Sequence, residues 1–230
     1  MPQPTAIVDI KTLGPDPDHH PMWQIVVIHR ADPYDPATDS IHWWQIRPSE
    51  QSLHNADSHT VEHSGYHAQM RVPRETSTVS FLAPAGPTRI EPADLDKEIL
   101  ALLDGAELIG ATPNFDARFL RARLNAAPWN PRTLDITTLA AGFLLGKAHA
   151  YTGREPFWGT PPDYYASTRY LVEGRLPHRL SQGTGVRPPR PEPNRSALGN
   201  ALWARRLHDR ITLPPTLYAA THPSPVFADR

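Results

Sequence analysis

The chain has 230 residues, of which 39% are hydrophobic and 20% are charged, so it can bury a core and has the composition of a globular protein. It contains no cysteine, which excludes disulfides and thiolate metal sites and fits a cytoplasmic protein. Its formal net charge of -1 excludes a global basic field, so any binding of nucleic acid must rest on a local patch. We expect no signal peptide and no membrane helix, because no apolar stretch approaches the ~20 residues that a membrane span needs.

The first part of the chain predicts three strands that pair as an antiparallel meander. They are expected at residues 6–11, 23–30 and 42–46. In the first strand, Asp9 and Lys11 fall on the same face as Ile7. A short helix and its flanks are predicted at 51–70.

From residue 92 onward, helical and strand patterns alternate, which predicts an α/β layered fold. The helices are expected at 92–103, 114–124, 137–145, 162–173 and 196–211, and the strands at 107–111 and 133–136. A segment rich in Pro, Gly and Tyr at about 150–195, with a loop at 180–194, interrupts this pattern. We therefore predict one domain over residues 1–213 with an insertion, followed by a Pro-rich tail at 214–230.

Three separated segments carry short motifs on defined elements. The first is VDIKTLG at 8–14, at the end of the first strand. The second is LIGATPNFDARFL at 108–120, a hydrophobic strand followed by Asn-Phe-Asp and a helix. The third is RSALGNA at 195–201, at the start of the last helix. Each motif alone is weak, but three in this order on these elements are specific.

Together these segments resemble the motifs of the DnaQ-like (DEDDh) 3′–5′ exonucleases of the ribonuclease H-like superfamily. Those motifs read Asp-x-Glu-Thr-Thr-Gly, Asn-x-x-Phe-Asp and His-x-Ala-Leu-x-Asp-Ala; here the Asn lies closer to Phe-Asp. The resemblance implies a ribonuclease H-like mixed sheet, with a three-stranded antiparallel meander plus parallel strands, flanked by helices. It also implies hydrolysis of phosphodiesters by four carboxylates that hold two Mg²⁺ or Mn²⁺ ions about 4 Å apart, with a histidine as general base.

The resemblance places the four carboxylates at positions 9, 11, 116 and 200 and the histidine at 195. This chain has Asp9, Lys11, Asp116, Asn200 and Arg195 there. Two acids and two cations give this cluster a net charge of zero. A cation about 4 Å from a divalent ion opposes its binding by several kcal/mol at an effective dielectric of 20, and arginine stays protonated, so it cannot be a general base. We predict a pseudo-exonuclease in which Asp9 and Asp116 bind metal weakly or not at all.

Two alternatives remain open at this stage. One is a weakly active exonuclease that uses Asp9 and Asp116, and the other is a purely structural or interaction protein. Lys11 either bridges Asp9 and Asp116 in place of a metal or reaches into solvent, and together with Arg195 it could hold a phosphate.

Other segments concern ligands and partners. By the same resemblance, Thr12, Leu13, Asn114 and Phe115 are expected to contact single-stranded DNA or RNA. The segment 187–193, RPPRPEP, is either a polyproline II element that docks a protein partner or a stiff surface loop. The three histidines at 59, 63 and 67 have metal-capable spacing, but Gly65 weakens their helix and a solvated helix is the favoured interpretation.

Overall fold

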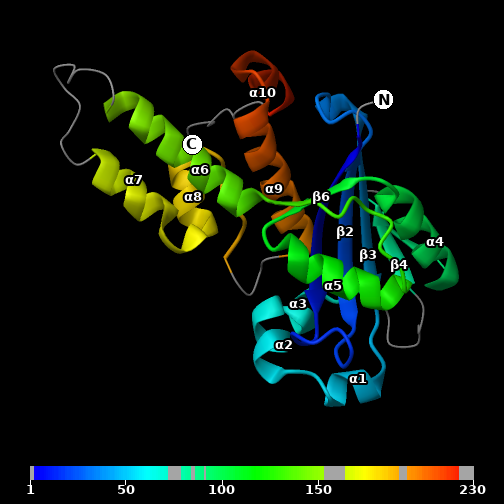
Figure 1. Ribbon diagram of the computed structural model, residues 1–230. Helices are drawn as coiled ribbons and strands as arrows, with labels where there is room; N and C mark the ends of the chain where they lie inside the picture. Colours follow the sequence, from blue (N-terminus) through cyan, green and yellow to red (C-terminus); the bar gives the residue numbers. More distant parts are fainter. Residues whose placement is uncertain are drawn as a thin grey trace, which may run out of the picture.

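A mixed sheet of seven strands runs through the middle of the molecule (Figure 1). The structure is a computed structural model that describes residues 3–71, 79–83, 86–90, 92–152, 164–191 and 196–222. The strands are β1 (Thr5–Thr12), β2 (Met22–Arg30), β3 (Asp39–Ile46), β4 (Val79–Ala83), β5 (Gly86–Ile90), β6 (Glu107–Gly110) and β7 (Thr133–Asp135). Their order in the sheet is β5-β4-β3-β2-β1-β6-β7.

The five strands β3-β2-β1-β6-β7 have the topology that the sequence predicts. β1, β2 and β3 form the antiparallel meander, β6 pairs parallel to β1, and β7 pairs parallel to β6. The expected α/β fold with a ribonuclease H-like mixed sheet is therefore confirmed. The antiparallel hairpin of β4 and β5 extends the sheet beyond β3 and is not predicted, because the Pro-Ala-Gly-Pro run at 84–87 is typical of a loop.

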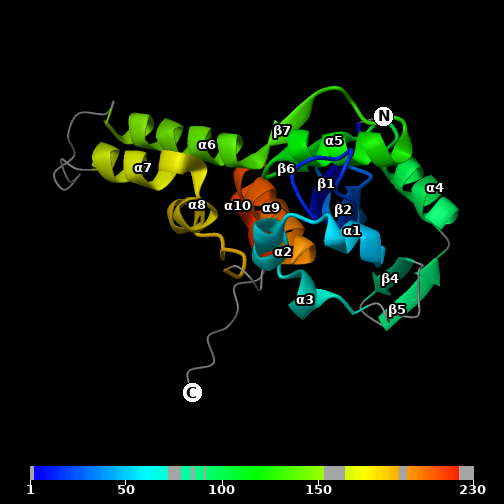
Figure 2. The same cartoon turned by 90° about the horizontal axis from the view of Figure 1, so that it is seen from below.

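Helices cover both faces of this sheet (Figures 1 and 2). They are α1 (Glu50–His54), α2 (Ser58–Ser64), α3 (Tyr66–Gln69), α4 (Pro92–Leu103), α5 (Pro113–Leu124), α6 (Ile136–Thr152), α7 (Tyr164–Val172), α8 (Pro177–Thr184), α9 (Ala197–Thr212) and α10 (Pro215–Thr221), with two 3-10 turns, η1 (Pro36–Thr38) and η2 (Glu173–Arg175). Alternate residues of β1 enter two cores: Val8 and Ile10 pack with α4 and α5, whereas Ile7 packs with α6 and α9. In the described part of the chain, no helix is long and apolar enough to cross a membrane.

The segment after β3 forms three short helices, where a single short helix is predicted. The Asp57 side chain caps α2 by accepting a hydrogen bond of 2.7 Å from the amide of Thr60. Gly65 then ends α2 with a φ of 69°, a conformation that favours glycine. Tyr66 of α3 packs edge-on against Trp23, with ring centroids 5.2 Å apart. These contacts hold α2 and α3 beside the carboxyl end of β1 (Figure 1).

Two helices lie where the sequence predicts a loop and a tail. α8 contains a single long apolar residue, Leu180, so no helical periodicity marks it, yet Ser181 accepts a hydrogen bond of 2.9 Å from the Trp203 indole of α9. α10 begins at Pro215, and proline is favoured at the first position of a helix although it indicates a tail elsewhere. Residues 223–230 of the predicted tail lie outside the described residues.

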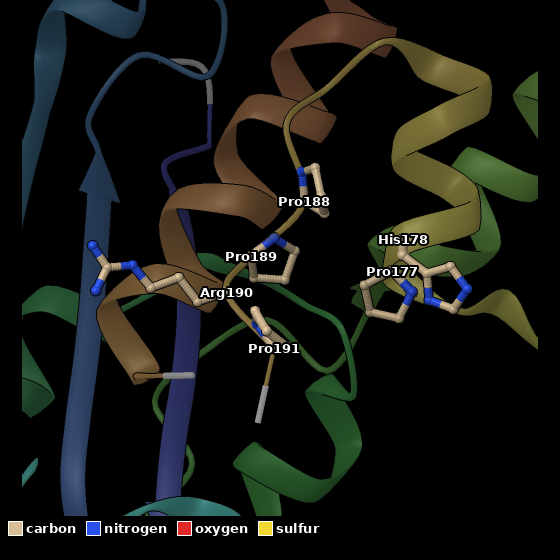
Figure 3. A pocket seen from close by; sticks show the side chains of 6 residues that line it. All are labelled: Pro177, His178, Pro188, Pro189, Arg190 and Pro191. Carbon is tan, nitrogen blue, oxygen red and sulfur yellow. The ribbon is translucent and has the colours of Figure 1, made fainter. Parts of the chain in front are cut away.

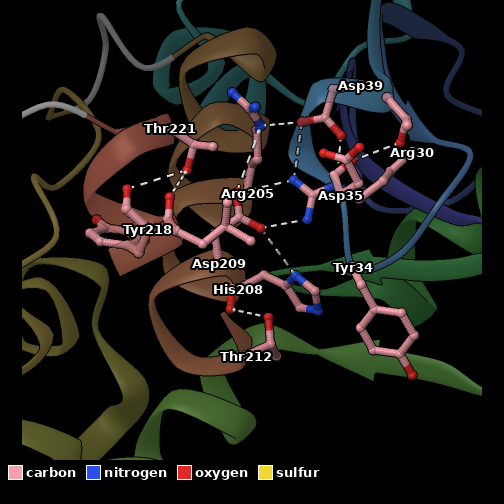
Figure 4. Close-up of polar contacts among 12 residues, drawn as sticks. Arg30, Tyr34, Asp35, Asp39, Arg205, His208, Asp209, Thr212, Tyr218 and Thr221 are labelled. Carbon is pink, nitrogen blue, oxygen red and sulfur yellow. Dashed lines mark hydrogen bonds and ion pairs between the residues drawn. The ribbon is translucent and has the colours of Figure 1, made fainter. Parts of the chain in front are cut away.

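A buried cluster of charged side chains joins the meander to the last helices (Figure 4). Arg30 of β2 is fully buried and donates from Nε to Asp39 of β3 at 2.6 Å, and from Nη2 to Asp209 of α9 at 3.0 Å. Arg205 of α9 also pairs with Asp39, and His222 Nε2 lies 2.8 Å from Asp209 Oδ2. The cluster therefore fixes α9 and His222, which directly follows α10, against the sheet.

Candidate nucleic-acid interface

The three sequence motifs converge at the carboxyl end of β1. Asp9 lies on β1, Asp116 lies in the first turn of α5, and Asn200 lies in the first turn of α9. Asn200 Nδ2 donates hydrogen bonds to both carboxylate oxygens of Asp9, at 3.0 Å and 3.2 Å. Arg195, which stands where the resemblance expects the histidine, lies outside the described residues.

Asn200 is positioned by the way α9 begins. Ser196 caps the helix by accepting a hydrogen bond of 3.0 Å from the amide of Gly199. The amide of Ala197, the first residue of α9, donates a hydrogen bond of 2.8 Å to the side-chain oxygen of Gln24, which is fully buried on β2. The first turn of α9 is thus tied to the sheet, and Asn200 faces Asp9 as a result.

Asp116 is almost completely buried, with 3% of its surface exposed. Burial raises its pKa well above the usual range, and the charge of Asp9 raises it further. A hydrogen bond from the Ile10 amide and the charge of Lys11 oppose that rise without cancelling it. The carboxyl also packs tightly on Gly110, where an added Cβ would lie 3.2 Å from Asp116 Oδ2 and 3.0 Å from the carbonyl oxygen of Val8.

Lys11 does not bridge the two aspartates. Among the residues that the structure describes, it makes no ion pair with Asp9 or Asp116, although its charge reaches Asp116. The β1–β2 register shifts between Lys11 and Thr12, which pair with Gln24 and Met22, and such an irregularity redirects side chains. Both residues line an open pocket, in which Lys11 is half-buried.

This pocket has a volume of about 280 Å³. It is lined by Lys11 and Thr12 of β1, by His59, Thr60 and His63 of α2, and by Phe115 of α5. It therefore brings together three residues that the sequence singles out for the site, Lys11, Thr12 and Phe115.

The other two residues that the resemblance assigns to nucleic-acid contact lie elsewhere. Leu13 is fully buried and packs with Trp23 and Tyr66. Asn114 is exposed, and its side-chain oxygen accepts a hydrogen bond of 3.2 Å from Thr133.

His59 and His63 also line this pocket, although the sequence favours a solvated helix for them. Their rings stack with centroids 3.9 Å apart, whereas His67 is separated from them by the turn at Gly65. The spacing of four residues puts the two rings on one face of a helix. Nothing in the sequence, however, indicates that this helix lies across from the end of β1.

The described side chains do not fit a two-metal centre. Within the described ranges, no group of three or more His, Asp or Glu side chains is arranged to hold a metal ion. An ionised carboxylate only accepts hydrogen bonds, so Asn200 presents its amide nitrogen, which is not a metal ligand, to Asp9.

The Pro-rich segment lies at a second pocket (Figure 3). A cavity of about 250 Å³ is lined by Pro188, Pro189, Arg190 and Pro191 and, at the start of α8, by Pro177 and His178; the Arg190 side chain extends away from α8. Residues 192 and 193 of this segment lie outside the described residues.

No family model matches the sequence, and no curated protein matches it. Solved structures match nearly the whole chain. The zinc-ion-bound complex of E. coli exonuclease I with single-stranded DNA has a TM-score of 0.55 and 14% identity, over 95% of this chain and 42% of that one. Product-bound exonuclease I gives 0.51 and 13%, over 96% and 46%, and an apo exonuclease I gives 0.52 and 15%, over 96% and 44%. The chain thus spans less than half the length of these proteins, and identities this low establish the fold alone.

Proposed function

Because this chain has the DnaQ-like exonuclease fold seen in exonuclease I, we propose that it binds single-stranded nucleic acid at the end of β1 without hydrolysing it efficiently. The resemblance of its three motifs assigns the catalytic positions to Asp9, Lys11, Asp116, Arg195 and Asn200. In this proposal only Asp9 and Asp116 keep the acidic side chain of an exonuclease, and the site has little affinity for Mg²⁺ or Mn²⁺.

The contact between Asn200 and Asp9 carries the proposal. An aspartate at position 200 would face Asp9 with a second negative charge, and a cation between them would be needed to relieve the repulsion. The amide of Asn200 instead donates to both oxygens of Asp9, so this pair is stable without a metal. Lys11 adds a positive charge near Asp116, which further opposes a divalent cation.

Binding of a single strand is supported by the pocket beside these residues. It is open to solvent, and it offers the ammonium group of Lys11 and the ring of Phe115. Cations and aromatic rings are the groups with which proteins hold unpaired strands. E. coli exonuclease I, which has a similar fold, has been solved in complex with single-stranded DNA.

A weak metal-dependent exonuclease is the second candidate. Asp9 lies near enough to Asp116 for its charge to raise the pKa of that carboxyl. Two carboxylates this close could together bind one divalent ion. This candidate uses Asp9 and Asp116 as its only acidic ligands.

One assay separates these candidates. Labelled single-stranded DNA is incubated with the protein and Mn²⁺, and both cleavage and retention on a filter are scored. Retention without cleavage supports the proposal. Cleavage that is abolished by Asp9→Ala supports the weak exonuclease, and neither cleavage nor retention supports a purely structural or interaction protein.

A second experiment tests the assignment of the motifs. The triple variant Lys11→Glu, Arg195→His and Asn200→Asp restores each motif, and we expect it to gain Mn²⁺-dependent 3′–5′ cleavage. If the variant folds but neither binds Mn²⁺ nor cleaves, the assignment of the motifs is wrong.

The remaining parts of the proposal concern the whole chain. We propose that residues 1–213 form one domain with an insertion at about 150–195, followed by the segment 214–230. We also propose a cytoplasmic location, and a protein partner that binds the polyproline segment 187–193 through the exposed Pro188 and Pro191. Alanine substitution of Pro188 and Pro191 would test the last point, since it should abolish capture of that partner.

A further inference from the structure

The pocket at the end of β1 has a lining suited to an unpaired nucleotide. Within the described part of the chain, its lining includes one cation, Lys11, and no carboxylate. Its volume of about 280 Å³ is close to the lower end of the range for small-molecule sites, ~300–1,000 Å³. An anion of the size of one nucleotide therefore meets no like charge in the lining.

The ring-bearing residues of the pocket come from two helices. His59 and His63 of α2 stack on each other with an interplanar angle of 24°, so the pair leaves its outer ring faces for a stacking partner. Phe115 of α5 lines the same pocket, and its ring is supported by Phe119 at a centroid distance of 4.8 Å. Unpaired bases are bound by stacking on Phe and His rings of this kind.

Contacts within α2 hold the rings of His59 and His63 in place. The Nδ1 atom of His63 lies 3.0 Å from the carbonyl oxygen of His59, and because a carbonyl only accepts, Nδ1 is the donor. Asp57 and Gly65 fix the two ends of α2, as described above. The rings are therefore prepared before a ligand arrives, which reduces the entropy lost on binding.

We propose that Lys11, His59, His63 and Phe115 form a metal-independent subsite for one nucleotide of a single strand. Lys11 binds a phosphate as a point charge, and the base stacks against the rings of His59, His63 and Phe115. This inference rests on the proposed binding of single-stranded nucleic acid. It adds that the strand is held by a cation and aromatic rings, so that divalent ions are not needed.

The test measures the binding of a fluorescent oligothymidylate of about 12 nucleotides by anisotropy, in EDTA and in Mg²⁺. We expect similar affinities in both. The double variant His59→Ala/His63→Ala should weaken binding by about fivefold or more, as loss of base stacking does. The control His54→Ala removes an exposed histidine from the neighbouring helix α1 and should leave affinity unchanged.

Two further variants separate the ring from the charge. His59→Phe/His63→Phe keeps the aromatic surface and should restore most of the affinity. Lys11→Ala should weaken binding and reduce the dependence of log K on log salt concentration by about 0.7, the value for one phosphate of a single strand. Lys97→Ala removes an exposed lysine of α4 and should do neither.

The outcomes distinguish the two levels of the proposal. If the wild-type protein binds no oligonucleotide in either buffer, the proposed function itself fails. If it binds only with Mg²⁺, or if the histidine double variant binds as well as wild type, the metal-independent subsite is wrong while the proposed binding of single-stranded nucleic acid stands. An abasic oligonucleotide provides the final comparison, because the histidine variants should not affect its binding.

Discussion

Asn200 differs from aspartate by a single NH₂ group, yet this group changes what the site requires. With an amide at position 200, Asp9 receives two hydrogen bonds and needs no cation. With a carboxylate there, the same geometry would put two negative charges about 3 Å apart and leave both without a donor. In the proposed function, the contact between Asn200 and Asp9 is therefore what lets the site dispense with a metal.

We predict that Asn200→Asp lowers stability and makes it respond to metal. The loss of the two hydrogen bonds should cost about 1–3 kcal/mol, which corresponds to a fall in Tm of several degrees for a chain of this size. Mn²⁺ should recover part of this loss by occupying the space between the carboxylates. Thermal unfolding with and without Mn²⁺ measures both effects.

The control for this prediction is Asn114→Asp, at an exposed position of α5. It introduces the same charge and should change Tm little, with or without Mn²⁺. An Asn200→Asp protein whose Tm equals that of wild type in both conditions would contradict the prediction.

Asp116 gives a second prediction, about pH. Burial and the charge of Asp9 raise the pKa of this carboxyl in the folded state, so the folded chain holds a proton that the unfolded chain releases above about pH 4. The contribution of Asp116 to the stability of the wild-type protein should therefore decrease as pH rises from about 4 toward neutrality. Asp116→Asn removes this contribution, so it should be more stable than wild type at pH 7 and nearly equal to it below pH 4.

Urea unfolding between pH 3.5 and pH 8 checks this prediction, with the range chosen to span the ordinary pKa of aspartate at about 3.9. Asp94→Asn, at an exposed carboxylate of α4, is the matched control and should show no gain at pH 7. A variant at 116 that is less stable than wild type at pH 7 would show that the carboxylate is held ionised in the fold.

At the scale of secondary-structure elements, α9 depends on the buried charge cluster near its carboxyl end. Burial alone would raise the pKa of Asp209, but its contacts with His208, Arg30 and His222 outweigh burial and hold the pKa well below the usual range. The matching guanidinium of Arg30 has a pKa raised above its usual value by Asp39 and Asp209, against the effect of burial. Each charge in this cluster is therefore stabilised by the others.

We predict that Asp209→Asn destabilises the fold by about 3–5 kcal/mol at pH 7, because it leaves the buried Arg30 with a weaker set of acceptors. The sign of the pH dependence follows from the lowered pKa. The contribution of Asp209 is present above the unfolded pKa of about 4 and is lost as pH falls below it. The difference between variant and wild type in urea unfolding should thus shrink in acid, and a constant difference from pH 7 to pH 2 would contradict this.

The elements also show how far the sequence alone reaches. The helix at 92–103 was predicted with its observed ends, and α5 and α9 within one residue, because Pro and Ser mark their starts and apolar residues recur along them. The hairpin of β4 and β5, α8 and α10 were not predicted, since prolines and polar residues conceal the periodicity there. These elements are stabilised by contacts with distant segments, such as the bond from Trp203 to Ser181.

The same distinction applies to the candidate site. Asp9, Asp116 and Asn200 were found from the sequence because each lies in a local motif, and the structure brings Asp9 and Asn200 into contact. The sequence does not identify His59 and His63 as pocket residues, because their place in the pocket depends on how the three short helices pack beside the end of β1. Arrangements of this kind depend on tertiary packing, which a local pattern does not encode.

At the scale of the whole molecule, the net charge of -1 limits how nucleic acid can bind. A protein without a basic field gains little from long-range attraction, and its affinity must come from a few local contacts. We predict that log K for a single strand falls with log salt concentration with a slope no steeper than about -2, equivalent to two or three phosphates. Titrations at several salt concentrations measure this slope, and a value near -5 would reveal an extended basic track instead.

The helix α9 carries Asn200 in its first turn and Asp209 further along, where the buried charges secure it to the sheet. The chemistry at one end and the anchorage at the other are therefore separate tasks performed by a single helix. In the course of evolution, the side chains in the first turn of α9 could be substituted one by one while the buried charges around Asp209 kept the helix in place. Loss of an enzymatic activity would then leave a folded protein available for a new use.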